Sequence, residues 1–273
     1  MEVVLLRGAS GLYLAATVAA LTGIAVRRDF PSRLFLWLVG AGLALHVASI
    51  TIRALLVGHV PVANFGEGLS LLAALLVALF LVVQRRGPLI ALGAVIMPLA
   101  FGLTLAASVL KGGAQPLPAI LQSVWLPVHV LLAFLGDAVF AIACSASVLY
   151  LIQERRLKAH RGRGVLRQLP SLERLDQVSH TCLKWGLILL TLGIVTGIVW
   201  AHEAWGRGDW VGDPKLLFSL LVWALYTVLL QGRMTAGWRG RWAAQLTIAG
   251  FAVIVVSLVS VNLLGLGIHG RAF

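Results

Sequence analysis

The fold of this chain is decided by residues 185–230, which read "WGLILLTLGIVTGIVWAHEAWGRGDWVGDPKLLFSLLVWALYTVLL". Both ends of the stretch are continuous apolar runs, and a helix of about 20 apolar residues crosses the roughly 30 Å hydrocarbon core of a bilayer. Between the runs, Trp200 to Lys215 holds three tryptophans, a histidine and several charged residues. The stretch therefore predicts two transmembrane helices joined by an aromatic, charged connection with a potential binding role.

Apolar runs of this kind recur along the 273 residues of the chain. Hydrophobic residues make up 60% of it and charged residues 12%, whereas a soluble domain carries roughly 25% charged residues. Only helices and closed barrels satisfy their backbone groups in lipid, and continuous rather than alternating runs favour helices. We therefore predict an all-α, polytopic bundle of eight transmembrane helices in a single domain over residues 1–273. The expected spans are residues 8–26, 34–57, 66–84, 88–110, 124–152, 180–200, 216–231 and 243–266.

Basic residues collect in alternate connections between these spans. By the positive-inside rule, the connections rich in Lys and Arg face the cytoplasm. Both termini and the tryptophan-rich connection are then extracytoplasmic, and the expected location is a bacterial cytoplasmic (inner) membrane. The net charge of +12 thus reflects topology in a lipid bilayer, and we expect no nucleic-acid partner. The residues on the predicted cytoplasmic side are Arg27, Arg28, Arg33, Arg85, Arg86, Arg155, Arg156, Lys158, Arg161, Arg163, Arg167, Arg174, Arg233, Arg239 and Arg241.

The longest basic connection lies between the fifth and sixth spans. Its last part predicts an amphipathic turn or short helix that begins at Ser171. Leu172 and Leu175 would rest on the membrane interface, with basic residues near anionic headgroups.

Several classes of function are excluded by what the sequence lacks. Cys144 and Cys182 show no CxxC or CxxCH spacing, which argues against a disulfide framework, a thiol relay and covalent haem attachment. No nucleotide-binding loop and no catalytic acid–base pair is recognisable, so we expect neither an independent ATPase nor a hydrolase.

Four histidines fall in the predicted outer third of the molecule: His59, His129, His202 and His269. Two imidazoles on separate helices beneath an aromatic connection could ligate a haem iron axially. Tryptophan faces would pack on the porphyrin, and Arg or Lys could pair with its propionates. The alternative is an aromatic belt with anchoring charges at the interface, which requires no ligand.

Deeper in the membrane, His46 and Arg53 are seven residues apart and share one face of the second span. Asp137 lies eight residues beyond His129, about 12 Å of helix rise. An Arg53–Asp137 pair is one possible arrangement. Structural neutralisation and proton relay would each explain such groups, and we favour neutralisation.

Several motifs resemble a known family in the same order along the chain. The segment "GHVPVANFGEGLSLL" resembles the "GHFPLSNLYES" segment of the CcsA family, the membrane subunit of system II cytochrome c synthases. "VHVLLAFLGDAVFAIACSASVLYLIQERRLK" is similar to the helix that follows the first outer histidine of that family. "GWRGRWAAQLTIAGFAVIVVSLVSVNLLGLGIHG" resembles its end, with the second outer histidine. The resemblance covers roughly residues 50 to 270.

This resemblance implies an eight-helix, haem-handling bundle, at most the membrane subunit of a cytochrome c haem-lyase complex, with no catalytic residues of its own. It implies haem b as cofactor, and apocytochrome c and other cytochrome c maturation membrane proteins as partners. His129 and His269 match the two outer histidines that ligate the haem iron, and His59 matches one ligand of a membrane-embedded haem. Trp205, Trp210, Asp213 and Pro214 match parts of the WWD loop, which presents haem to the apocytochrome.

The sequence also departs from the family pattern. Gly212 stands where a tryptophan is expected, Phe218 replaces a later tryptophan, and Gln231 replaces the second membrane histidine. Asp137 stands where the family usually carries tyrosine. Gln231 and Gly212 point to an alternative, a HemX-like accessory or regulatory protein of haem biosynthesis without haem transfer, because they are the losses expected if the transfer chemistry has decayed. A transporter using His46, Arg53 and Asp137 ranks last, because no inverted repeat is evident.

Overall fold

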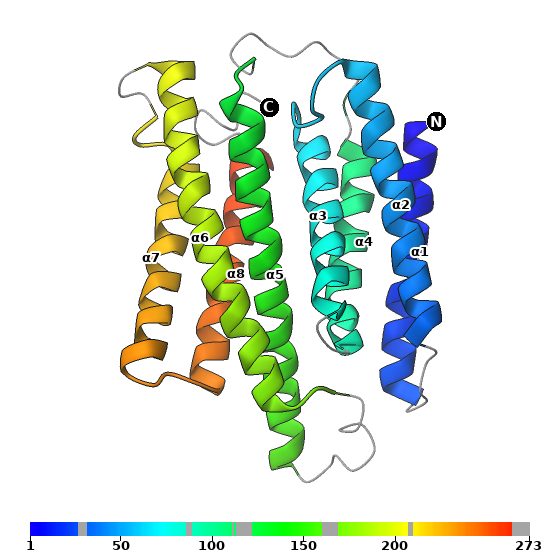
Figure 1. Ribbon diagram of the computed structural model, residues 1–273, viewed down its shortest axis with the longest axis vertical. Coiled ribbons are helices and arrows are strands. Elements are labelled where there is room, and N and C mark those ends of the chain that lie inside the picture. The colour runs from blue at the N-terminus through cyan, green and yellow to red at the C-terminus, as the bar shows by residue number, and fades with distance from the viewer. Residues whose placement is uncertain are drawn as a thin grey trace.

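The structure is a computed structural model that describes residues 1–26, 32–85, 89–110, 112, 122–159, 169–206 and 210–263. All regular secondary structure within these residues is helical, as Figure 1 shows. Eight of the helices are long and apolar enough to cross a membrane, which confirms the predicted all-α bundle. The elements are α1 (Glu2–Val26), α2 (Ser32–Val57), α3 (Phe65–Arg85), the 3₁₀ turn η1 (Ile90–Leu92), α4 (Gly93–Leu110), α5 (Trp125–Lys158), α6 (Leu172–Trp205), α7 (Pro214–Thr235) and α8 (Arg241–Leu263).

The helices form two halves of four (Figure 1). In the first half α1 packs on α2 and α4, and α3 packs on α4. In the second half α5 packs extensively on α6 and also on α8, while α7 packs on α8. The main contact between the halves is that of α3 with α5. The cavity described below lies entirely within the second half.

The sixth helix differs from the prediction at its start. It begins at Leu172, where the Ser171 side chain caps it by accepting a hydrogen bond from the Arg174 backbone N–H at 3.2 Å. The predicted short interfacial helix is therefore the first part of α6. Leu175 is fully buried rather than resting on the membrane surface, so that part of the prediction was wrong. The cause is packing of this segment against the rest of the bundle, which outweighs its amphipathic pattern.

α5 and α6 pack closely through the glycines Gly136, Gly186 and Gly193, which we together call the glycine seam. A Cβ atom at Gly193 would lie 3.4 Å from the Ala133 backbone nitrogen, and one at Gly136 would lie 3.4 Å from that of Leu190. A Cβ atom at Gly186 would collide with the Phe140 ring. Small residues permit such close approach, which drives helix association in membranes, where the surrounding lipid is as apolar as the helix surfaces.

A Gly186→Leu substitution is therefore expected to overpack this seam and destabilise the bundle by about 1–3 kcal/mol or more. The measurement is thermal unfolding in detergent, followed as the loss of the monodisperse peak in size-exclusion chromatography. The matched control is Gly40→Leu on α2, where an added Cβ atom meets nothing within 4 Å. Equal loss in the two variants would contradict the role of the seam.

Buried charges in the first half pair with each other. Arg53 donates from Nε to Glu67 Oε1 at 2.9 Å, and its Nη1 lies 3.3 Å from Glu2 Oε1. Glu67 Oε2 in turn accepts the Ala63 backbone N–H at 2.8 Å. The carboxylates that pair with Arg53 among the described residues include Glu67 and Glu2, and the Arg53–Asp137 pair considered from the sequence does not form. This arrangement agrees with neutralisation, which we favoured over proton relay.

His46 is also accounted for by hydrogen bonds. Its ring is fully buried, with Nε2 2.9 Å from Ser70 Oγ and Nδ1 3.4 Å from the Tyr13 hydroxyl. A buried polar group with such partners stabilises a helix interface without requiring a ligand. His46 therefore links α1, α2 and α3.

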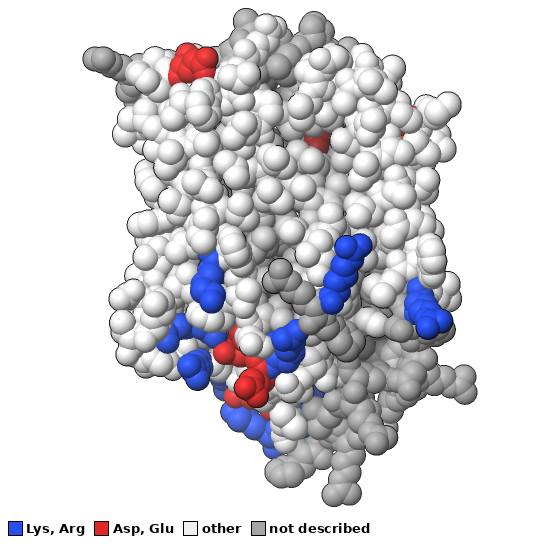
Figure 2. Space-filling model, viewed as in Figure 1, with Lys and Arg blue, Asp and Glu red and all other residues white. Residues whose placement is uncertain are grey.

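The charge distribution over the molecule is uneven. Figure 2 shows Lys and Arg side chains gathered over the lower part of the visible face, where α6 begins and α7 meets α8. This is the separation that the alternating basic connections predict. The assignment of that end to the cytoplasm, and of both termini to the outside, stays a prediction from the positive-inside rule.

Candidate functional site

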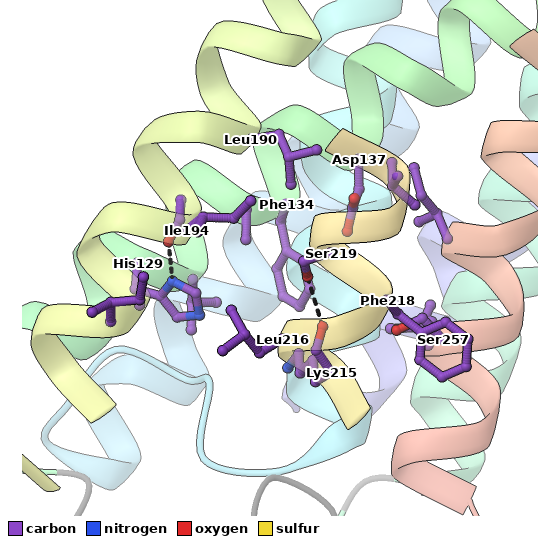
Figure 3. Close-up of a pocket in the computed structure, with 18 of the residues that line it drawn as sticks. His129, Phe134, Asp137, Leu190, Ile194, Lys215, Leu216, Phe218, Ser219 and Ser257 are labelled. Carbon is purple, nitrogen blue, oxygen red and sulfur yellow. Dashed lines mark hydrogen bonds between the residues drawn. The ribbon is translucent and has the colours of Figure 1, made fainter. Parts of the chain in front are cut away.

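A cavity of about 130 Å³ lies between α5, α6, α7 and α8. Its walls are mostly aliphatic and aromatic, with a few polar side chains among them (Figure 3). Clefts that enclose a whole drug-sized ligand measure roughly 300–1,000 Å³, so this cavity accommodates the edge of a large ligand. The polar side chains that line it are His129, Asp137, Trp210, Lys215, Ser219 and Ser257.

His129 is held in a fixed orientation from α6. Its Nδ1 lies 2.8 Å from the Gly193 carbonyl oxygen, the contact drawn in Figure 3. Because a carbonyl can only accept, Nδ1 carries the proton, and the neutral ring then has its lone pair on Nε2. Metal-binding histidines commonly use this arrangement, in which a backbone carbonyl orients the ring and raises its basicity.

One face of α6 packs against the His129 ring, and we call this face the seat of the ring. Gly193, Gly197 and Trp200 are spaced four and three residues apart, so they share that face. A Cβ atom at Gly197 would lie 2.7 Å from His129 Cε1, so only glycine leaves room for the ring there. The Trp200 ring lies parallel to the imidazole, with centroids 6.1 Å apart and an interplanar angle of 16°.

The tryptophans that were expected in a loop lie largely on helix. Trp200 is 1% exposed and packs with Leu126, and Trp205 meets it edge to face with centroids 4.8 Å apart. Both lie on the last turns of α6, which ends at Gly206 in the left-handed region (φ 72°). Trp210 follows and donates from Nε1 to the Gly206 carbonyl at 3.0 Å. Trp205 therefore supports the wall behind His129, and Trp210 lines the cavity.

Asp213 starts α7. It is 3% exposed, its Oδ1 accepts the Lys215 backbone N–H at 2.9 Å, and Pro214 occupies the first helical position. Asp213 therefore serves as the helix cap. The orientation that it gives the first turn of α7 places Lys215 on the cavity wall.

Asp137 and Lys215 face the same cavity from α5 and α7 (Figure 3). Each is half-buried and lines the cavity. Within the part of the chain that the structure describes, neither side chain has a hydrogen-bonding or ion-pair partner.

Two of the other histidines predicted from the sequence, His59 and His202, lie within the described residues, and neither lines this cavity. His59 lies in the first half, where its Nδ1 is 2.9 Å from the Val60 carbonyl oxygen. Its Nε2 is buried without a hydrogen-bond partner in the described ranges. His202 is exposed at the end of α6. His269 lies outside the described residues, so its pairing with His129 stays a prediction.

Gln231 bears on the predicted membrane-embedded haem. It lies exposed near the end of α7, whereas His59 follows α2 in the other half and at the opposite end of the bundle (Figure 1). This fold does not bring residues 59 and 231 together. At Gly212, where the family pattern has tryptophan, an added Cβ atom meets nothing within 4 Å among the described residues.

Sequence reasoning missed Gly193, Gly197 and Lys215. The two glycines carry a signal, since their spacing places them on the same helix face as Trp200, but their contact with His129 depends on the packing of α5 on α6. Lys215 gave no local signal beyond its place in the tryptophan-rich stretch. Within the described residues no group of three or more His, Cys, Asp or Glu side chains could hold a bare metal ion.

These features define a class: a polytopic helical membrane protein whose second half holds one oriented histidine beside a tryptophan cluster. Comparison with known proteins gives the family. The family described as "Cytochrome C assembly protein" matches residues 43–269, and the chain belongs to it.

Its relatives are similar over nearly their whole length. A protein of Synechococcus sp. (strain CC9605), named "Cytochrome c biogenesis protein CcsA", is 32% identical, covering 98% of this chain and 96% of that protein. A protein of the same name from Synechococcus sp. (strain RCC307) is 34% identical over 89% of this chain and 86% of its own. A third protein of that name, from Prochlorococcus marinus (strain MIT 9303), is 33% identical over 85% of this chain and 86% of its own length. The resemblance to the CcsA family is thereby confirmed.

Proposed function

We propose that this chain acts in cytochrome c maturation as a haem-handling membrane protein. His129 and, as the second predicted ligand, His269 would hold haem b at the extracytoplasmic end of the cavity. The haem would then be presented to an apocytochrome c held by partner membrane proteins of the same process. The observation that supports this proposal most directly is the hydrogen bond from His129 Nδ1–H to the Gly193 carbonyl oxygen. It orients the ring and places the lone pair on Nε2, the atom that would bind the iron.

The residues at the site fit this cargo in chemistry and in shape. Trp210 adds an aromatic face to the cavity lining, and aliphatic side chains complete the walls against which an apolar macrocycle would pack. The cavity accepts only the edge of a porphyrin, so the rest of the ring would lie at its mouth, where it remains accessible to an acceptor. Haem is the group transferred, and this chain contributes its binding and orientation.

The tryptophan cluster and the glycine seam add rigidity. Trp200 and Trp205 fill the space behind the imidazole, and Gly193 contributes both the carbonyl acceptor and the close approach of α5. A ligand on rigid, mutually packed helices keeps its geometry better than one on a loop. The site is therefore suited to binding and presenting haem.

The proposal predicts a coloured protein. Purified in mild detergent from haem-replete cells, it is expected to show a Soret band and sharp α and β bands after dithionite. His129→Ala is expected to abolish or strongly reduce these bands, because an axial ligand is lost. His202→Ala is the matched control, because it removes an exposed histidine near the end of α6 that does not line the cavity. A colourless protein that also fails to take up added haemin would overturn the proposal.

The HemX-like alternative predicts other partners. The relatives compared above are all named for cytochrome c biogenesis, which favours the first proposal. Affinity purification distinguishes the two, because a haem-handling subunit retrieves cytochrome c maturation proteins. Retrieval of haem-biosynthesis enzymes alone would favour the alternative.

A further inference from the structure

The cavity contains one acid and one base that the proposed function does not use. Asp137 and Lys215 both face it, and neither has a partner among the described side chains. Ionisable groups at membrane depth are costly, and they are normally paired or functional. The pair therefore requires an explanation beyond cavity lining.

Elsewhere in the bundle, buried charges pair directly. Arg53 Nη2 lies 2.9 Å from Glu67 Oε1, and Arg233 Nη2 lies 2.7 Å from Asp176 Oδ2. If Asp137 and Lys215 served only to neutralise each other, the same close contact would be expected. Instead both side chains line the cavity, and among the described residues no ion pair within 4.0 Å joins them. A ligand group that enters the cavity can therefore meet either side chain.

The position of Lys215 indicates which part of a ligand it meets. It lies in the first turn of α7, at the loop end of the cavity, while Asp137 lies about 12 Å of helix rise beyond His129 on α5. Figure 3 shows Lys215 and His129 toward the loop end and Asp137 deeper between the helices. A ligand held at His129 therefore presents its periphery to Lys215.

We propose that Lys215 is the carboxylate anchor of this cavity. On the proposed function, from which this inference starts, the carboxylate is a haem propionate, and the Lys215 ammonium donates hydrogen bonds to it. Asp137 is the counter-ion that keeps the lysine side chain inside the cavity when no ligand is bound. Binding exchanges one anionic partner of Lys215 for another.

The exchange gives opposite predictions for the two residues. Loss of Lys215 removes the ligand's charged partner, which is worth about 10- to 100-fold in affinity for a charge-assisted hydrogen bond. Loss of the Asp137 charge removes a competitor and a nearby negative charge, so Asp137→Asn is expected to bind a carboxylate ligand more tightly. A purely structural pair would weaken binding in both variants.

The experiment compares haemin with haemin dimethyl ester, in which both propionates are esterified, by Soret titration of the haem-free protein in detergent. The unaltered protein is expected to prefer haemin by about 10- to 100-fold. Lys215→Met is expected to bind both compounds with the affinity of the ester, and Lys215→Arg to retain the preference. Lys184→Met is the matched control, because it removes an exposed lysine of α6 outside the cavity.

The possible outcomes distinguish failure of the Lys215 anchor from failure of the proposed function. Equal affinity of the unaltered protein for haemin and its ester would overturn the anchor while leaving haem binding, and the proposed function, intact. A Lys215→Met variant that keeps the preference would overturn it equally, and weaker haemin binding by Asp137→Asn would overturn the exchange. Failure of the unaltered protein to bind either compound would overturn both the proposed function and this inference.

Discussion

Replacing Arg53 by methionine is expected to destabilise the first half of the bundle by about 3–5 kcal/mol, because it leaves a buried carboxylate without its counter-ion. Glu67 is 3% exposed, and Arg53 reaches it from both Nε and Nη2 at 2.9 Å. Arg53 also donates to the Gly112 carbonyl at 3.1 Å, which ties the segment after α4 to the same cluster. The measurement is equilibrium unfolding in mixed detergent micelles.

Two further variants identify the cause. Arg53→Met/Glu67→Gln removes both charges and is expected to recover part of the lost stability, since no uncompensated charge remains on α3. Lys158→Met breaks the pair with Glu154, whose lysine side chain is 67% exposed, and is expected to cost less than about 1 kcal/mol. Similar losses of stability for Arg53→Met and Lys158→Met would contradict the prediction that the buried ion pairs of Arg53 matter more than an exposed pair.

Replacing Gly197 by alanine is expected to weaken haemin binding by about 10- to 100-fold, the effect usual for groups that orient a metal ligand. The added Cβ atom would lie 2.7 Å from His129 Cε1 and 2.8 Å from Nδ1, so the ring must move and its hydrogen bond to Gly193 must lengthen. Alanine has a higher helix propensity than glycine, so the substitution is not expected to reduce the amount of folded protein by weakening α6. Soret titration measures the effect.

The control for Gly197→Ala is Gly102→Ala on α4, where an added Cβ atom meets nothing within 4 Å. This variant is expected to bind haemin normally. A Gly197→Ala variant with unchanged affinity and unchanged reduced spectrum would show that the seat on α6 does not set the orientation of His129.

The sequence predicted the helices better than their ends. Each apolar run became a helix because lipid leaves the backbone no other way to satisfy its polar groups. The start and the end of α6 were missed because both are polar. Ser171 caps one end, and residues up to Trp205 continue the other through packing of Trp200 on Leu126. Hydropathy reports burial in lipid and is insensitive to such protein–protein packing.

The site was predictable where chemistry depends on residue type, and unpredictable where it depends on packing. His129 stood out as an ionisable group near a membrane interface, and the structure places it in the cavity. The partner of Arg53 could not be read from spacing, because the sequence suggested Asp137 and the packing of α2 on α3 brings Glu67 to it instead. Gly197 and Lys215 acquire roles only through helices that lie apart in the sequence.

The glycine seam between α5 and α6 also determines which wall of the cavity can move. Added Cβ atoms at Gly136 and Gly193 would already contact backbone nitrogens of the opposite helix at 3.4 Å, so these two helices are closely packed and would lose much contact if they parted. α7 meets α6 through fewer contacts, including the hydrogen bond from Trp223 Nε1 to Thr191 Oγ1 at 3.0 Å. α5 and α6 are thus the more tightly packed walls of the cavity, and α7 is held to α6 less extensively. A flat molecule wider than the cavity would therefore be admitted most readily by an outward tilt of α7, which would displace Lys215 with that helix.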